Sequence, residues 1–180
     1  VYKRQDKRNA IHYENMSISL AESLANQGQG MVYSMAFGNG GTSVDPTGII
    51  TYLSPNSTGT NASLYNQTYT KVIDDNSINN TDPTRNKIET RHVSGTNYTD
   101  IIATCLLDYG EPSGQDALDN ATGSDSLYVF DELGLVSYAT SGTGRLLTHV
   151  IFHPVQKSLN RLIQIDYTVR VQSLTGFNEA

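Results

Sequence analysis

The chain has 180 residues and a mass of 19.7 kDa, a length typical of a single domain. Charged residues make up only 17% of it and its mean hydropathy is -0.38, so Asn, Ser, Thr and Gly supply most of its polarity. This low content of charged residues argues against a disordered chain and a coiled coil. The formal net charge of -6 argues against a nucleic-acid platform. The sequence has no run of roughly 20 apolar residues, which argues against a membrane-spanning helix.

The N-terminal segment is basic, whereas the rest of the chain is acidic. Residues 1–8 contain one carboxylate, Asp6, and four cationic side chains, Lys3, Arg4, Lys7 and Arg8. The segment lacks an apolar core, so we expect neither a signal peptide nor a membrane anchor. It has two interpretations: a frayed, solvated terminus, or an arm that becomes ordered on an acidic surface of another copy or another protein. The acidic body should repel phosphate backbones, so direct nucleic-acid contact is not expected.

A short helix is predicted over residues 17–28. Ser19 and Glu22 have the spacing of a capping box, and Gly28 is a natural stop. We therefore expect two units: an arm and short helix over residues 1–28, and a β-domain over residues 29–180.

The remaining elements are predicted strands separated by turn residues. They cover residues 31–37, 49–53, 69–73, 87–93, 101–109, 127–130, 134–138, 146–153 and 162–172. The last strand alternates apolar and polar residues, which indicates one face in a core and one face in water or against a polar partner. Residues 101–107 lack this alternation and predict a central strand covered on both faces.

Three connections are longer than usual, at residues 38–46, 54–67 and 74–86, and are expected to be contact or decoration elements. Many short strands and almost no helix predict an all-β, mainly antiparallel fold. The expected architecture is a β-sandwich of jelly-roll type with one short N-terminal helix and an extended N-terminal arm.

The residues give no support for a catalytic or metal site. Cys105 lies in an apolar run and is expected to be a buried small hydrophobe. His149 and His153 share one strand face, but at strand rise their rings are about 13 Å apart, too far for one zinc ion. Asp131 and Glu132 are neighbours on a strand and are expected to point to opposite faces, so they form no evident acid/base pair.

Two loops have superficial likenesses to ligand sites. The oxygen-rich residues 74–82 lack the glycine and closing glutamate of a calcium loop, so a cluster of turns is favoured over a cation site. Residues 140–145 lack the ending of a phosphate-binding loop and are interpreted as a hairpin turn. We therefore predict no catalytic residues, no cofactor and no metal, and a protein that is not an enzyme.

Several runs of sequence resemble virion structural proteins of large, contractile-tailed bacteriophages. In the C-terminal third they are residues 128–135 (Tyr-Val-Phe-Asp-Glu-Leu-Gly-Leu), 146–157 (Leu-Leu-Thr-His-Val-Ile-Phe-His-Pro-Val-Gln-Lys) and 160–171 (Asn-Arg-Leu-Ile-Gln-Ile-Asp-Tyr-Thr-Val-Arg-Val). Upstream they are residues 36–41 (Ala-Phe-Gly-Asn-Gly-Gly), 64–67 (Leu-Tyr-Asn-Gln) and 104–111 (Thr-Cys-Leu-Leu-Asp-Tyr-Gly-Glu). The resemblance contains no motif that assigns a catalytic or binding residue.

This resemblance implies a non-enzymatic virion component made in the bacterial host cytoplasm. The favoured position is a neck or collar ring that joins head to tail; a capsid decoration protein and a tail or baseplate subunit are the alternatives within the class. The implied partners are further copies of the chain and other phage structural proteins of the portal or connector, tail or capsid, with no membrane contact. Outside the class, a carbohydrate-binding sandwich and a loop-carboxylate hydrolase stay as alternatives, although the absence of tryptophan counts against sugar binding.

Such assemblies join subunits through strand edges and extended arms, because main-chain hydrogen bonds can continue from one sheet into the next. In this chain the arm is expected to cover residues 1–13, with Tyr2 and Tyr13 as aromatic anchors. For Tyr2, a plain exposed terminal residue is the alternative interpretation. The candidate interface residues are Tyr2, Lys3, Arg4, Lys7, Arg8 and Tyr13.

Overall fold

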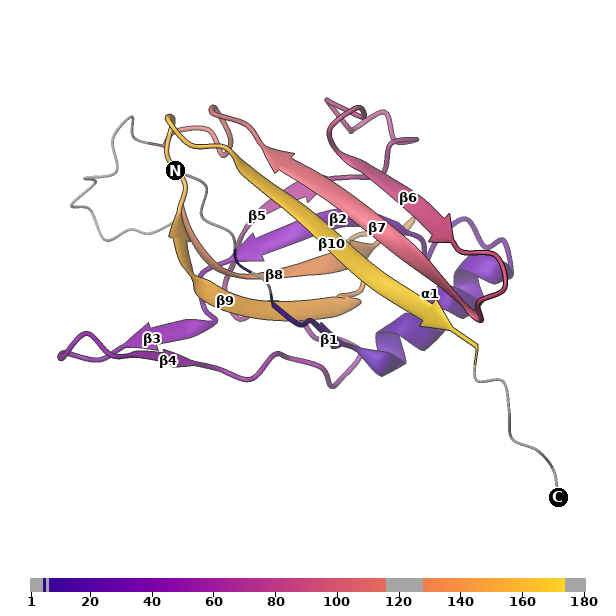
Figure 1. Ribbon diagram of the computed structural model, residues 1–180, viewed down its shortest axis with the longest axis horizontal. Coiled ribbons are helices and arrows are strands. Elements are labelled where there is room, and N and C mark those ends of the chain that lie inside the picture. The colour runs from indigo at the N-terminus through magenta and orange to yellow at the C-terminus, as the bar shows by residue number, and fades with distance from the viewer. Residues whose placement is uncertain (1–4, 6, 116–127, 174–180) are drawn as a thin grey trace, which may run out of the picture.

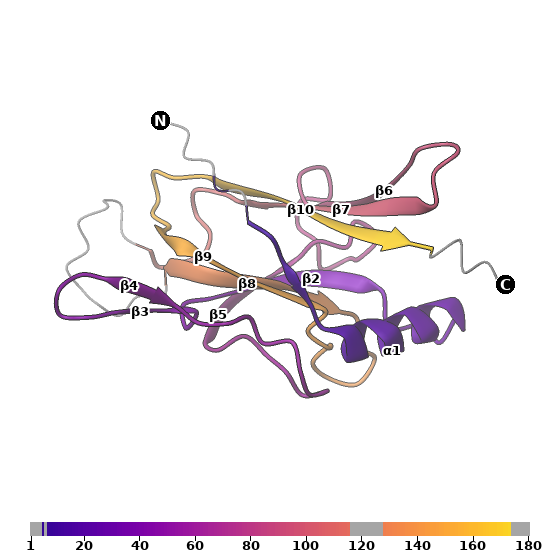
Figure 2. The same ribbon diagram turned by 60° about the horizontal axis from the view of Figure 1, so that its bottom comes forward.

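The computed structural model describes residue 5, residues 7–115 and residues 128–173, and it consists of two antiparallel sheets packed face to face (Figures 1 and 2). The larger sheet has the order β1-β9-β8-β2-β5 and the smaller one the order β10-β7-β6. The strands of the larger sheet are β1 (Ala10–Ile11), β2 (Val32–Gly38), β5 (Gln67–Val72), β8 (Val129–Ser137) and β9 (Thr148–Gln156). Those of the smaller sheet are β6 (Lys87–His92), β7 (Tyr98–Leu107) and β10 (Ile163–Gln172). The predicted all-β, mainly antiparallel sandwich is confirmed.

A separate hairpin, β3 (Thr42–Val44) and β4 (Ile50–Tyr52), extends beyond the sandwich beside β9 (Figure 1). The sequence pattern does not predict β1 or β3, because strands of two or three residues are too short to show a period.

The hydrophobic core lies between the two sheets. Phe37 of β2 packs against Phe130 of β8 and Tyr69 of β5, with ring centroids 5.3 and 6.1 Å apart. Each large side chain that is fully buried stabilises the fold by about 1.5 to 3 kcal/mol. The buried members of this core are Met35, Phe37, Ile73, Ala103, Cys105, Leu107, Phe130, Leu133, Leu135, Leu147, Val150, Tyr167 and Val169.

Strand β10 has the predicted alternation. Tyr167 and Val169 are buried in the core, whereas Asp166, Thr168 and Arg170 are exposed. Burial also raises the pKa of Tyr167 to about 12, against the opposing influence of the Thr148 and Asn9 side chains.

Strand β7 is central in its sheet, as predicted, but only one of its faces is fully covered. Ala103, Cys105 and Leu107 are buried, whereas Ile102 and Leu106 on the outer face are half-buried. The apolar residues on both faces of β7 therefore predicted a more deeply buried outer face than the fold provides. Cys105 is confirmed as a buried core residue, and burial raises the pKa of its thiol to about 12.

The segments predicted as two strands, 127–130 and 134–138, are one continuous strand, β8. Asp131 and Glu132 interrupt the apolar pattern but are buried within this strand. The register between β8 and β9 is irregular at these residues. Phe130 pairs with Val155 and Glu132 pairs with Ile151, so a step of two residues along β8 corresponds to a step of four residues along β9. This bulge explains how β9 continues past Pro154, since proline is tolerated in a strand where the ladder is broken.

Helix α1 (Tyr13–Leu24) begins and ends four residues earlier than predicted. Its N-cap is His12, whose Nδ1 accepts a hydrogen bond from the Asn15 backbone N–H at 3.1 Å, and Ser19 is buried in the middle of the helix. The capping box at Ser19 is therefore wrong. An imidazole nitrogen can accept this hydrogen bond, as the side-chain oxygen of Ser or Asp does. The N-cap rule that we applied to the sequence considers the oxygen-bearing side chains and not His.

The segment between the arm and the helix belongs to the larger sheet. Ala10 and Ile11 pair with His149 and Thr148 of β9, and the Asn15 amide donates to the Leu146 carbonyl at 2.9 Å. Gly30, just after the helix, leaves no room for a side chain, because a Cβ there would lie 2.4 Å from the Ser19 carbonyl oxygen.

We predict that Val169→Asp unfolds the domain. Val169 is 4% exposed, so the change places an unpaired carboxylate in the core and should cost at least about 4 kcal/mol. The matched change Thr168→Asp, on the exposed face of the same strand, should alter the unfolding free energy by less than about 0.5 kcal/mol. Urea unfolding followed by circular dichroism distinguishes the two, and equal losses would contradict the assigned faces.

Candidate assembly surface

The described part of the N-terminal arm runs along the outer edge of β9. The Gln5 side chain donates from Nε2 to the His153 carbonyl and accepts at Oε1 from the His153 backbone N–H, both at 3.2 Å. Further along, β1 pairs with β9, and the His12 N–H donates to the Leu147 carbonyl at 2.9 Å. The side-chain amide of Gln5 thus takes the place of a neighbouring strand.

Three of the six candidate interface residues lie in the described part, and all three are exposed. Lys7 lies 5.6 Å from the ring centroid of Tyr52, which connects the arm to the β3–β4 hairpin. Arg8 is exposed, and Tyr13, the first residue of α1, is 79% exposed. Tyr2, Lys3 and Arg4 lie outside the described residues.

The hairpin beside the arm carries an exposed apolar surface. Val44 and Ile49 are 61% and 63% exposed, and Tyr52 and Leu53 are exposed as well. The Tyr52 hydroxyl lies 3.2 Å from His153 Nδ1, so the hairpin is attached to the bulge of β9. Clustered apolar side chains in solvent are typical of surfaces that bind another protein.

Asp131 holds the base of this hairpin. Its carboxylate accepts hydrogen bonds from the backbone N–H groups of Gly41 and Thr42, each at 2.9 Å, and from the Thr42 hydroxyl. The Leu53 N–H donates to the Gly41 carbonyl at 2.9 Å, which closes the base from the other side. The hairpin is therefore held in place by a side chain of the core strand β8.

Glu132 holds a second loop against the outer face of the larger sheet. Its Oε1 accepts from the backbone N–H groups of Gly40 and Asn66, at 3.0 and 2.8 Å. Its Oε2 accepts from the Tyr65 N–H and from His149 Nε2, both at 2.9 Å. Burial raises the pKa of this carboxyl group, but the hydrogen bonds from His149 and the backbone outweigh it, and the net pKa is lowered.

The hydrogen bonds of His149 indicate its tautomer. Its Nδ1 accepts the Asn56 backbone N–H at 2.7 Å, so the ring proton resides on Nε2 and is donated to Glu132. His12 has the same arrangement: Nδ1 accepts from Asn15, and Nε2 lies 2.8 Å from the Gly59 carbonyl. Two buried histidines thus attach the loop between β4 and β5 to the body of the domain.

These contacts correct one expectation about neighbouring residues. Asp131 and Glu132 were expected to face opposite ways, but at the bulge both carboxylates bind the same short segment, Gly40 to Thr42. His149 is buried beside Glu132, whereas His153 is exposed. The described residues contain no group of three or more His, Cys, Asp or Glu placed to hold a metal ion.

The sequence pattern does not predict this network, although it contains one signal for it. Two adjacent carboxylates lie inside an otherwise apolar strand run, and a charge buried in such a run must be satisfied by hydrogen bonds. The long loop at residues 54–67, expected to be a contact element, supplies part of them. Its Leu64 is buried against Ala36 and Leu146 on the outer face of the sheet.

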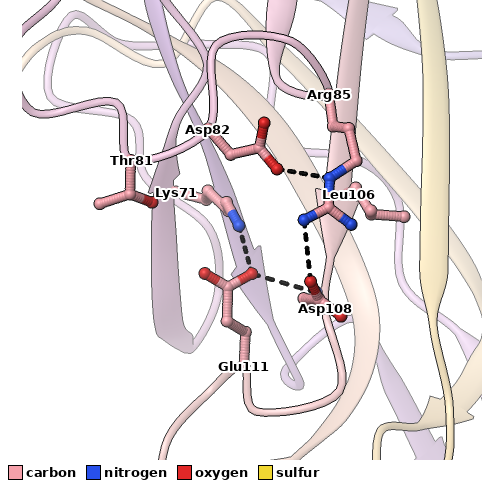
Figure 3. A pocket seen from close by; sticks show the side chains of 7 residues that line it. All are labelled: Lys71, Thr81, Asp82, Arg85, Leu106, Asp108 and Glu111. Atoms are coloured by element: carbon pink, nitrogen blue, oxygen red, sulfur yellow. Dashed lines mark hydrogen bonds and ion pairs between the residues drawn. The ribbon is translucent and has the colours of Figure 1, made fainter.

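A small polar pocket of about 230 Å³ lies where the chain passes from β5 to β6 (Figure 3). Lys71 pairs with Glu111, and Arg85 pairs with Asp82 and, at 3.0 Å, with Asp108. A hydrogen bond from Thr84 and the pairing with Arg85 lower the pKa of Asp82. The lining residues are Lys71, Thr81, Asp82, Arg85, Leu106, Asp108 and Glu111. The cations of this pocket are thus already paired with carboxylates of the same chain.

The neighbouring residues 74–82 form turns, as predicted. Asp74 accepts from the Asn76 N–H at 3.0 Å, and the Asn80 amide donates to the carbonyls of Asp74 and Asn86. The predicted hairpin turn at residues 140–145 also connects β8 to β9, with Gly142 at a φ of +98°.

The smaller sheet has two edges that no other strand covers within the described residues. One edge is β6, whose exposed face carries Lys87, Glu89 and Arg91, and the other is β10. In the larger sheet the arm covers the β9 side, and β5 forms the opposite edge. An uncovered strand edge is a surface on which a further strand can pair.

Comparison with protein-family models, with curated proteins and with solved structures finds no match for this chain. In the part of the chain that the structure describes, no helix has the length and apolar character needed to cross a membrane.

We predict that Glu132→Gln destabilises the protein by about 3 kcal/mol at pH 7, because an amide NH₂ group then faces hydrogen-bond donors in a buried site. Since the pKa of Glu132 is lowered on folding, its contribution is complete above about pH 4.3, the value expected for an unfolded glutamate, and is lost as the pH falls through the folded pKa.

Urea unfolding between pH 3 and pH 7 tests this prediction, and the variant should lose part of the acid dependence. The matched control is Glu89→Gln, whose side chain is 55% exposed in a pair with Lys87 and should matter little. An identical pH profile for the native protein and Glu132→Gln would contradict the assignment.

We predict that the arm can be removed up to residue 9 but not up to residue 12. Deleting residues 1–9 removes the Gln5 contacts with β9 and leaves β1 and the helix cap in place. Deleting residues 1–12 also removes β1 and His12, with the pairing to β9, the helix cap and the bond to Gly59, and should cost at least about 2 kcal/mol more. Thermal unfolding of the two truncated proteins measures the difference, and equal stability would show that His12 does not hold the helix and loop.

Proposed function

We propose that this protein is a non-enzymatic structural subunit of a tailed-phage particle, and within the particle a ring protein of the neck or collar that joins head to tail. The proposal combines the sequence resemblance with a sandwich that has uncovered strand edges, a terminal arm and a projecting hairpin. Its partners would be further copies of the chain and the portal, connector, tail or capsid proteins beside it.

The observation that carries the proposal is the exposed apolar surface of the β3–β4 hairpin. Val44, Ile49, Tyr52 and Leu53 lie in solvent, yet the segment is fixed at its base by Asp131 and at its side by His153. A rigid apolar projection loses little conformational freedom when it binds a partner. This combination is expected of a subunit contact.

The described arm residues divide between two roles. Gln5 and residues 10–12 bind β9 of their own chain, whereas Arg8 and Tyr13 point their exposed side chains to solvent. We assign the second set to contacts with a neighbour, together with the open strand edges.

The titratable groups of the described residues support a structural role. Glu132, Asp131 and His149 use their polar atoms to hold loop backbone. The buried Lys157 ammonium donates to the carbonyls of Tyr109 and Ser158 and to the Gln115 side chain, and burial lowers its pKa. These side chains stabilise turns and loops, and their geometry offers no reacting atom to a substrate.

The position in the particle is tested by quantitative mass spectrometry of purified phage with antibody-gold labelling. A copy number close to one ring and gold at the head-to-tail junction are expected. Hundreds of copies over the head or along the tail would make the chain a decoration or tail protein instead. Absence from the particle would overturn the proposal.

We predict that Val44→Ser combined with Ile49→Ser leaves the domain folded but reduces incorporation into particles by about tenfold or more, because the apolar contact is lost. The matched control is Ile78→Ser, since Ile78 is fully exposed but lies in the turn cluster between β5 and β6. Incorporation is measured by mass spectrometry after complementation with each variant. Equal incorporation of all three proteins would exclude the hairpin as a contact.

A further inference from the structure

The exposed face of β10 has a sequence that is symmetric about Thr168. Two residues away on either side are Asp166 and Arg170, which have opposite charges, and four residues away are Gln164 and Gln172. All five side chains are exposed. When two such strands pair antiparallel about Thr168, each charge therefore meets its opposite and each glutamine meets a glutamine.

The backbone of β10 is suited to such pairing. It pairs with β7 over ten residues without any shift in register, and it contains neither proline nor glycine. Natural sheet edges are usually protected by lysine, proline or a bulge. Among the described residues, β9 has its bulge and Pro154, whereas β10 has no such interruption.

We propose that β10 pairs antiparallel with β10 of a second copy of this chain, on a two-fold axis that passes beside Thr168. The two three-stranded sheets then form one continuous six-stranded sheet. This inference rests on the proposed assembly role and names one contact of the subunit, with its partner, edge and register; a ring needs a head-to-tail contact in addition to this two-fold one. Each interaction across the axis occurs twice, as a two-fold contact requires.

The polar face of β10 supplies the charge complementarity. Arg170 is held by Asp100, with Nε and Nη2 at 2.7 and 3.0 Å from its carboxylate oxygens, and its guanidinium lies 3.8 Å from the Tyr98 ring centroid. Asp166 accepts hydrogen bonds only from Gln164 within the described residues, and it has no cationic partner there. Pairing about Thr168 gives Asp166 the preoriented Arg170 of the second copy.

The inner face of β10 gives a second argument. Val171 occupies a core-facing position but is 42% exposed. In the proposed register it lies opposite Ile165 of the second copy, which is itself only partly buried. Pairing therefore covers apolar surface that one chain leaves in water.

The other edge of the same sheet lacks the charge symmetry of β10 about its central exposed residue. Self-pairing of β6 about Glu89 would place Lys87 opposite Arg91 of the second copy and Glu89 opposite Glu89. Like charges directly opposite one another destabilise a strand pair. A two-fold contact centred on the middle charge of the strand is therefore unfavourable for β6.

Cysteine cross-linking of the full chain tests the register. The two Thr168 Cα atoms should lie about 4.5 to 5.5 Å apart, within disulfide range, so Thr168→Cys should give a covalent dimer under mild oxidation. The native Cys105 is buried and does not compete. Gln164→Cys is the matched control, because its two copies would be separated by about 27 Å along the strand and should stay monomeric.

A mixture of charge variants tests the pairing itself. Asp166→Arg alone and Arg170→Asp alone each place like charges opposite one another, so sedimentation equilibrium should show at least tenfold weaker self-association than for the native chain. In an equimolar mixture the two variants have complementary charges at both contacts, so a one-to-one heterodimer should form. Asp75→Arg and Arg91→Asp are the controls, since they make the same changes of charge away from β10; Arg91 lies on β6, in register with Asp100 of β7, so its variant also controls for a changed charge beside Asp100.

The outcomes separate this inference from the proposed function. A Thr168→Cys dimer together with recovery in the mixed variants supports the β10 contact. Cross-linking of Gln164→Cys equal to that of Thr168→Cys, or native self-association by Asp166→Arg, overturns it. If the protein is then still found in phage particles, the structural role stands and assembly uses another edge; if a β10 dimer forms but the protein is absent from particles, only the proposed function fails.

Discussion

The buried carboxylate of Glu132 imposes the constraint on which the outer face of the larger sheet depends. A charge removed from water must be satisfied by hydrogen bonds, and three backbone N–H groups and one imidazole satisfy this one. Those donors come from the connection after β2, the loop before β5 and strand β9. One side chain thus determines where two long polar loops lie, although neither loop has regular secondary structure at the contact.

The neighbouring carboxylate, Asp131, holds in place the surface that we assign to assembly. Asp131 fixes the base of the hairpin, and the β9 bulge opposite it presents His153 to the arm and to Tyr52. The interruption in the ladder therefore brings arm, hairpin and sheet edge together on one side of the molecule. In the smaller sheet, β10 has a regular edge that no other strand covers within the described residues. The two kinds of surface would give a subunit two distinct contacts.

Alternation along β10 predicts its buried face correctly, because a period of two follows directly from strand geometry. The apolar run around Cys105 predicts a central strand correctly but overestimates the burial of its outer face. The helix start could not be predicted from Ser19 and Glu22, since the cap at His12 depends on a histidine that also reaches Gly59, a residue far along the chain. The network of Glu132 could not be located either. Its donors are backbone groups, which every residue possesses, so the sequence shows the carboxylate but not its partners.

The contact between Gln5 and His153 joins residues 148 positions apart. Closing so long a segment costs conformational entropy, and β9 leaves the ribosome long after the arm. The arm therefore reaches its place only after β9 has been made. An incomplete chain lacks the support that His153 gives to Tyr52 and the hairpin, so premature subunits would present a poorly ordered contact. The order of synthesis would in this way delay association until the fold is finished.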